Sequence, residues 1–192
     1  MRSSLLPTSL LVPLVALTLN NVASAGPMPE EVIRSFYESY LRTLSNPSGG
    51  DRKALGFSED LRKAIEENRN VCEKYATGVC GFGADGDIYL DSQEYEQGLT
   101  LISSGFRIAE EVEGLITVSL NVYPSVSTAD HFYEKQVTFK MILEGEGWVV
   151  DDILYADHVS SKLRMREENE FYKSNPDPDS PYVKQKRGTD AQ

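Results

Sequence analysis

The fold is decided by residues 115–122, LITVSLNV, in which apolar and polar side chains alternate from Ile116 to Val122. Such alternation is typical of a β-strand with one face against the core and the other toward solvent. Residues 100–111, 134–143 and 148–155 are also rich in β-branched and aromatic side chains. Short glycine-containing segments separate the first pair and the last pair of these stretches, which favours hairpins. The second half of the chain is therefore predicted to form four strands of an antiparallel sheet.

Upstream of these strands, the apolar residues follow a helical period. Over residues 29–45 they recur at i, i+4, i+7 and i+8, which predicts a helix with one wide apolar face. A second helical pattern covers residues 59–73, with Ser58 placed to cap it. Residues 160–172 predict a third, more polar helix. Helices followed by strands indicate an α+β fold, with the N-terminal helices packed in a curved antiparallel sheet of about four strands and a C-terminal helix.

The first 25 residues have the pattern of a cleavable signal peptide. Arg2 supplies the positive start, residues 10–19 are apolar, and Ala23-Ser24-Ala25 has the small residues that signal peptidase recognises. The apolar stretch is shorter than the about 20 residues that a membrane span needs. We therefore expect cleavage after Ala25 and a periplasmic or secreted protein.

The composition narrows the classes of partner. The chain has 30 acidic and 19 basic residues, a net charge of −11. This charge argues against nucleic acid and against anionic lipid surfaces, and it suits a basic protein partner. No apolar stretch after the signal peptide is long enough to span a membrane. We predict one domain over residues 26–172 and, because residues 173–192 lack a hydrophobic pattern, a disordered tail.

Cys72 and Cys80 are the two cysteines of the chain. In an exported protein an even number of cysteines favours a disulfide, and closing so short a loop contributes about 2–3 kcal/mol. A nucleophilic thiol is the alternative. A metal site would need more ligands than two thiols, and His131 and His158 have no ligand-like spacing. We expect neither a metal nor a cofactor.

Three segments together resemble a known superfamily. They are the closing stretch GWVVDDILY at 147–155, the pattern FYxxYL at 36–41, and the aspartate-containing connection at 80–97. The chain resembles the nuclear transport factor 2-like (SnoaL-like) superfamily over about residues 30–171. Within it, the sequence is similar to the bacterial exported family called domain of unknown function 3828. The resemblance implies a cone-shaped fold, carries over no activity, and suggests a homodimer paired through the outer sheet face.

The superfamily also contains enzymes that use an Asp or a His with tyrosine in the pocket, such as ketosteroid isomerase. By analogy, the candidate pocket residues are Tyr40, Asp91, Tyr95, Asp152 and Tyr155. A general base would need Asp152 or Asp91 in an apolar wall that raises its pKa, with a tyrosine to stabilise an enolate.

Each of the two aspartates also has a structural interpretation. Asp151 and Asp152 should point to opposite faces of a strand, so at most one enters a pocket, where it can instead accept hydrogen bonds from loop amides. Asp91 can cap a short helical turn over residues 92–97. The segment Asp85-Gly86-Asp87 lacks the rest of an EF-hand calcium loop and favours a turn.

These observations predict an exported, non-enzymatic binding module. It would be an inhibitor or immunity-type protein, or a carrier of a small apolar ligand. One alternative is an isomerase- or cyclase-type enzyme that uses Asp152 as base and Tyr155 as hydrogen-bond donor. Another is a structural envelope factor without a pocket.

Overall fold

The computed structural model describes residues 26–46, 53–126, 133–156 and 158–190. The predicted signal peptide lies outside this range. The elements, in chain order, are α1 (Pro29–Ser45), α2 (Glu59–Tyr75), β1 (Arg107–Val112), β2 (Leu115–Asn121), the 3-10 helix η1 (Pro124–Val126), β3 (Glu134–Glu144), β4 (Gly147–Leu154), α3 (Ser161–Ser174) and α4 (Pro181–Asp190). The predicted α+β class is confirmed. Among the described residues, none of the helices has the length and apolar character that a membrane span requires.

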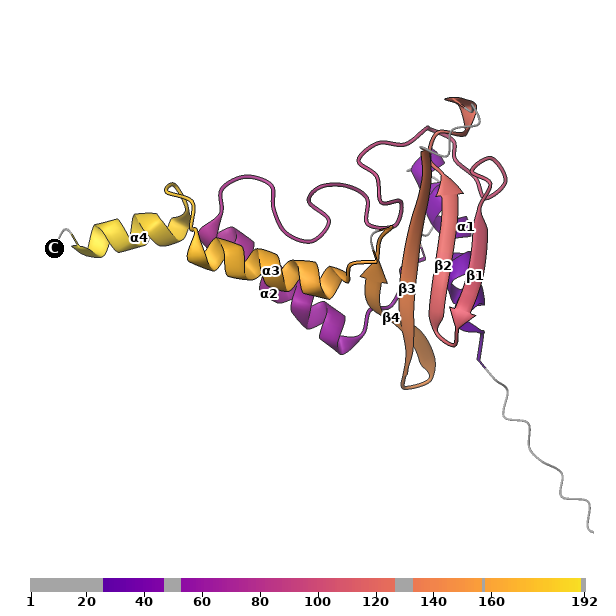
Figure 1. The fold of residues 1–192 in the computed structure, drawn as a ribbon, viewed down its shortest axis with the longest axis horizontal. Coiled ribbons are helices and arrows are strands. Elements are labelled where there is room, and N and C mark those ends of the chain that lie inside the picture. The colour runs from indigo at the N-terminus through magenta and orange to yellow at the C-terminus, as the bar shows by residue number, and fades with distance from the viewer. Residues whose placement is uncertain (1–25, 47–52, 127–132, 157, 191–192) are drawn as a thin grey trace, which may run out of the picture.

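The four strands form one open antiparallel sheet in the order β1-β2-β3-β4 (Figure 1). Its inner face carries the apolar set predicted from alternation, since Ile116 pairs with Phe139 and Val118 with Val137. The first strand begins at Arg107 instead of residue 100, because residues 101–105 form turns. Since β1 and β4 are the two edges of an open sheet, the cone expected from the family resemblance is not confirmed.

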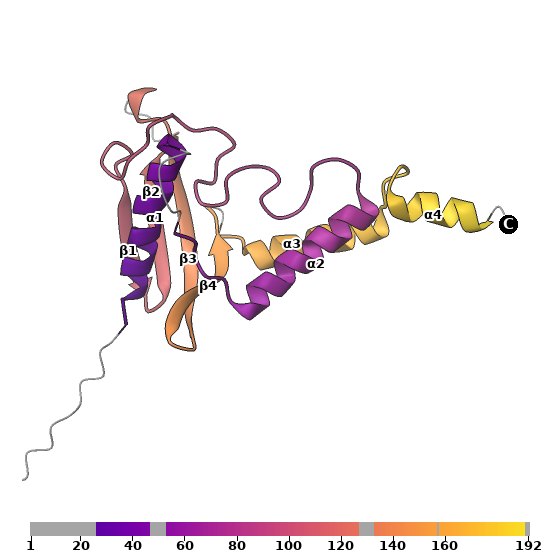
Figure 2. The same ribbon diagram turned by 180° about the vertical axis from the view of Figure 1, so that it is seen from behind.

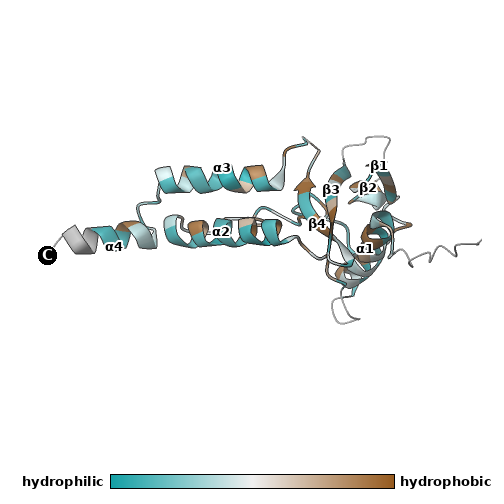
Figure 3. Ribbon diagram, turned by 90° about the horizontal axis from the view of Figure 1, so that it is seen from below, coloured by the Kyte–Doolittle hydropathy of each residue, from teal (hydrophilic) through white to brown (hydrophobic). Residues whose placement is uncertain are grey.

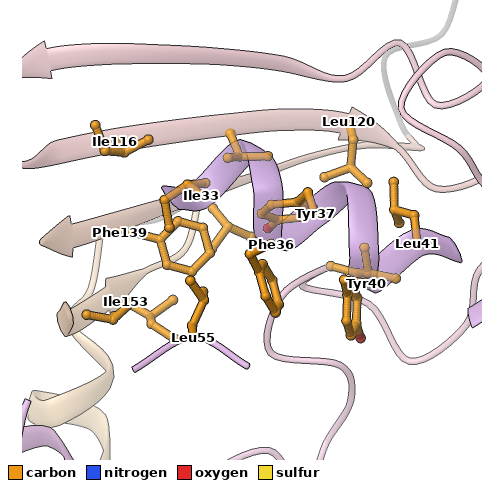
Figure 4. Close-up of a cluster of buried hydrophobic side chains, with 14 of the residues drawn as sticks. Ile33, Phe36, Tyr37, Tyr40, Leu41, Leu55, Ile116, Leu120, Phe139 and Ile153 are labelled. Carbon is orange, nitrogen blue, oxygen red and sulfur yellow. The ribbon is translucent and has the colours of Figure 1, made fainter. Parts of the chain in front are cut away.

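Helix α1 lies across one face of the sheet (Figure 2). Its apolar side chains Ile33, Phe36, Tyr37, Tyr40 and Leu41 are buried. They meet inward residues of the strands in the main core (Figure 4). Burial of each such side chain contributes about 1.5–3 kcal/mol. The predicted packing of the apolar face of the leading helix against the sheet is therefore confirmed.

The second helix packs against the core with its first turns, through Leu61, Ala64 and Ile65, but its later turns leave the sheet, so the prediction that it packs in the sheet is right only for its beginning. Helices α2 and α3 lie side by side and extend away from the sheet as an arm (Figures 1 and 3). Both begin beside β4. The backbone N–H of Ser58, just before α2, donates to the carbonyl of Val150, and Ser160, just before α3, forms an isolated β-bridge with Leu154. The two helices are therefore parallel. The sequence places few apolar side chains on the later turns of α2, so these turns have only a narrow apolar face to bury against a sheet.

The structure describes residues 181–190 as helix α4, within the segment where the sequence analysis expected a disordered tail. Ser180 is buried and accepts a hydrogen bond from the backbone N–H of Val183, and Pro181 begins α4. The ring of Tyr182 packs against that of Tyr75, at 4.8 Å between centroids. The dipeptide Ser180-Pro181 is typical of the start of a helix. The sequence analysis did not use this signal, because it judged the segment by its lack of a hydrophobic pattern.

Candidate functional site

Asp152, the expected general base, holds the start of α3. Its Oδ1 accepts hydrogen bonds from Ser161 Oγ at 2.7 Å, from its neighbour's backbone N–H at 2.9 Å and from the backbone N–H of Lys162 at 3.2 Å. Its Oδ2 accepts one from the hydroxyl of Ser160, the N-cap residue of α3. The carboxylate is buried, and both of its oxygens accept hydrogen bonds from the start of α3. This arrangement matches the structural interpretation, in which Asp152 accepts hydrogen bonds from backbone amides.

Asp151 holds the start of α2, as Asp152 holds the start of α3. Its Oδ1 accepts a hydrogen bond from Ser58 Oγ at 2.9 Å, and Ser58 is the N-cap residue of α2. Lys162 and Lys140 place their Nζ atoms 2.6 Å and 3.1 Å from its two carboxylate oxygens. Burial opposes ionisation of Asp151, but the hydrogen bonds from Lys162, Lys140 and Ser58 outweigh it and lower the pKa to about 2.

The expectation that Asp151 and Asp152 point to opposite faces is wrong. Both contact the first turn of α3. The reason is a bulge in β4: Lys140 pairs with Asp152 while Met141 pairs with Val150, so Asp151 is an extra residue. A bulge of this kind breaks the strict alternation of side chains along a strand. We call this pair, with the helix starts that it binds, the aspartate joint.

A cavity of about 810 Å³ lies beside this joint. Its walls come from three places: the segment 76–106 that returns from the end of α2 to the sheet, the ends of β2, β3 and β4, and the first turns of α3. Figure 1 shows this return segment running back beside α2 and α3. A volume of this size is ordinary for a ligand site.

The lining of the cavity is both acidic and aromatic. The carboxylates are those of Asp85, Asp87, Asp91, Glu94 and Glu168, and the aromatic rings are those of Phe82, Tyr123, Tyr133 and Tyr155. The cations are Lys135 and Arg164. Five carboxylates against two cations give the cavity a negative potential, and aromatic faces add attraction for cations.

Asp91 and Tyr155 are the two predicted pocket residues that line the cavity. Burial raises the pKa of the Tyr155 hydroxyl, and the Asp91 carboxylate adds to this effect while Arg164 opposes it. The guanidinium of Arg164 lies over the Tyr155 ring, 5.4 Å from its centroid. Asp152 lies outside the cavity lining, although Ser161, which lines the cavity, donates a hydrogen bond to it.

Tyr40 and Tyr95 also lie outside the lining. Tyr95 packs against the core at its edge, partly buried. Tyr40 is buried in the core and donates a hydrogen bond from its hydroxyl to Asp87. Tyr40 therefore supports the cavity wall through Asp87 instead of facing a ligand.

Asp87 forms the turn that the sequence predicted there. Its Oδ1 accepts hydrogen bonds from the backbone N–H groups of Tyr89 and Leu90, at 2.9 Å and 3.2 Å. Burial raises its pKa, and these two amides act in the opposite direction. Among the described residues, no cluster of side chains is suited to hold a metal ion.

The helical turn predicted after Asp91 is wrong. Residues 92–97 are irregular, and Asp91 has a left-handed backbone with φ of 48°. A hydrogen bond of 2.8 Å from the backbone N–H of Asp87 to the carbonyl of Ser92 closes the intervening loop. Because this hydrogen bond closes the loop, the backbone of Asp91 must adopt the left-handed conformation. Asp tolerates that conformation better than most residues.

One wall of the cavity, formed by Phe82 and Glu168, is fixed by Asn68, a fully buried residue of α2. Its Nδ2 donates to Glu168 Oε2 at 2.9 Å and to Asn169 at 3.0 Å, and its Oδ1 accepts from the backbone N–H of Phe82 at 2.6 Å. The backbone N–H of Gly81 donates to Glu168 Oε1 at 3.3 Å. Gly81 has φ of +90°, and a Cβ there would lie 3.2 Å from Asn68 Oδ1.

The predicted cysteine pair adjoins this wall. Cys72 and Cys80 are joined at disulfide geometry, with Cα atoms 5.9 Å apart. The bond ties the end of α2 to the residue that precedes Gly81. It thus holds the start of the return segment against the arm.

Several cavity residues were missed by the sequence analysis. On α3 they are Ser161, Arg164, Met165 and Glu168, which stand at i, i+3, i+4 and i+7 and so share one helix face. This helical spacing is visible in the sequence, but an analysis that looks for apolar residues at that spacing does not find a face that is mostly polar. Lys135 of β3 and Tyr133 just before that strand carry no comparable signal.

No protein-family model, curated protein or solved structure matches the chain. The resemblance to the nuclear transport factor 2-like superfamily and to the exported family within it therefore stays a prediction.

Proposed function

We propose that this chain is an exported binding module whose cavity takes cationic side chains from a basic protein segment. The observation that carries the proposal is the lining of one cavity by five carboxylates and four aromatic rings. The net charge of −11 supports it, because long-range attraction raises the rate at which a basic partner is encountered. An inhibitor of a basic enzyme is one form that such a module takes.

Two other functions have less support. A small apolar ligand would have to desolvate the carboxylates of the cavity without pairing them, which is costly. The isomerase- or cyclase-type enzyme needs Asp152 in a pocket with a free oxygen. Its carboxylate lies outside the cavity lining and binds the start of α3 instead.

The test is the binding of a fluorescein-labelled ten-residue peptide of alternating Arg and Ser, measured by fluorescence polarisation. A peptide with Gln in place of Arg serves as the reference. We expect the basic peptide to bind and the reference not to bind. Affinity for the basic peptide should fall about tenfold between 50 mM and 300 mM salt, because the attraction between charges is screened.

A pair of double variants tests whether the basic peptide binds in the cavity. The double variant Asp85→Asn/Glu94→Gln removes two exposed carboxylates of the cavity and should weaken peptide binding about fivefold. The variant Asp60→Asn/Glu66→Gln makes the same change of charge on α2, outside the cavity, and should have a much smaller effect. Equal losses in the two variants, or no binding of the basic peptide, would refute the proposal.

Export is the second part of the proposal. It is supported by residues 1–25 and by the cysteine pair, which suits an oxidising compartment. Expression of the full chain in a bacterium, followed by fractionation and intact mass measurement, should yield a periplasmic product that begins at Gly26 and is lighter than its reduced form by the mass of two hydrogen atoms. A product that stays in the cytoplasm with residues 1–25 attached would contradict this part.

A further inference from the structure

We infer that Glu168 selects the ligand of the cavity, and that the group it selects is a hydrogen-bonding cation, a guanidinium or primary ammonium, as opposed to a quaternary ammonium. This inference rests on the proposed function, since it names the chemistry that the cavity recognises. It follows from how the Glu168 carboxylate is held, from its remaining acceptor sites and from the aromatic rings that share its cavity.

Glu168 is held by groups from outside its own helix. Asn68 of α2 donates to Oε2, and Gly81 of the return segment donates to Oε1. Asn68 is fully buried and is itself fixed by hydrogen bonds to Phe82 and Asn169. The carboxylate therefore has a set orientation before any ligand arrives, which reduces the entropy that binding costs.

The two carboxylate oxygens still have acceptor sites for a ligand. An ionised carboxylate has about four acceptor sites, and the two amide donors occupy one on each oxygen. One site on each oxygen then remains, which is the arrangement that a guanidinium fills with two parallel N–H···O bonds. A primary ammonium can use one or both, whereas a quaternary ammonium has no N–H group to donate.

Other carboxylates of the cavity are less suited to this task. The oxygens of Asp87 already accept hydrogen bonds from Tyr40 and from two backbone amides. Asp85 is exposed, so a ligand gains less from pairing with it. Glu168 is partly buried beside Phe82, where hydrogen bonds between charged groups are less screened.

The test compares three probes with the same butyl chain: butylguanidinium, butylammonium and butyltrimethylammonium. Their binding to the mature protein is measured by NMR chemical-shift titration. Butylguanidinium should bind at least fivefold more tightly than butyltrimethylammonium, because charge-assisted hydrogen bonds favour it. Equal affinities for the three probes would overturn the inference without any variant being made.

Glu168→Gln tests the residue. It keeps the size of the side chain and an acceptor oxygen for Asn68, so urea unfolding should show a folded protein. The variant should bind butylguanidinium about tenfold more weakly but butyltrimethylammonium only about twofold more weakly, so that the preference is lost. Asp85→Asn makes the same change of charge in the same cavity, and it should weaken all three probes about twofold with the preference intact.

The possible outcomes separate this inference from the proposed function. If all probes and the basic peptide bind, but Glu168→Gln keeps the preference for butylguanidinium, the inference fails and the proposed function stands. If neither the peptide nor any probe binds, both fail.

Discussion

Replacement of Asp152 by alanine is expected to lower the free energy of unfolding by about 3 kcal/mol. The carboxylate accepts hydrogen bonds from Ser161, from Lys162 N–H and from the Ser160 hydroxyl, all at the start of α3. Because Asp152 and Ser161 are buried, the released donors would have poor access to water. The negative charge beside the N-terminus of α3 would also be lost.

This result distinguishes the aspartate joint from a catalytic role. A general base replaced by Asn should lose activity and keep stability, whereas Asp152→Asn should lose about 1–2 kcal/mol, since the amide nitrogen cannot accept hydrogen bonds. Urea unfolding monitored by the fluorescence of Trp148 measures both variants. Glu167→Ala, an exposed change on the same helix, is the control and should stay within about 0.5 kcal/mol. Wild-type stability in Asp152→Ala would contradict the joint.

Asp151→Asn is expected to destabilise the protein by about 2 kcal/mol at pH 7, with a loss that depends on pH. The folded pKa of Asp151 is about 2, below the ordinary value of 3.8. A lowered carboxyl pKa contributes stability that is complete above the unfolded pKa and disappears as the pH falls through the folded pKa. The pKa difference between the two states corresponds to about 2 kcal/mol.

The measurement is the unfolding free energy of wild type and Asp151→Asn at several pH values from 7 to 2. The difference should be constant above about pH 5 and should shrink from about pH 4 toward pH 2. Asp60→Asn, an exposed change in the first turn of α2, should show no such convergence. A difference that stays the same down to pH 2 would mean that the pairs with Lys162 and Lys140 do not stabilise the joint.

The elements that depend on local patterns were predicted closely. Helix α1 covers the range that its apolar period predicted, and Ser58 caps α2 as expected. Strand β2 follows the alternation of its side chains, since Ile116, Val118 and Leu120 are buried. In each case a hydrophobic period of 3.6 or 2 residues coincides with one buried face, so nearby residues suffice to predict the element.

The candidate site could be predicted only in part. Asp91 and Tyr155 were expected in a pocket and line the cavity, whereas Asp152, Tyr40 and Tyr95 do not. Glu168 was not expected at all. A cavity is built where distant segments meet, and the polar residues that face it follow no hydrophobic pattern.

The sequence by itself determined that an apolar helix packs on an antiparallel sheet, because the periods of its apolar residues leave few other ways to bury them. The tertiary structure alone decided that α2 and α3 leave the sheet as an arm, and that a bulge turns Asp151 and Asp152 toward the starts of these helices. It also decided that Asn68, Gly81 and Glu168 meet beside the cavity. These features depend on hydrogen bonds and charge pairs between residues up to a hundred positions apart, and such pairings leave no periodic trace in the chain.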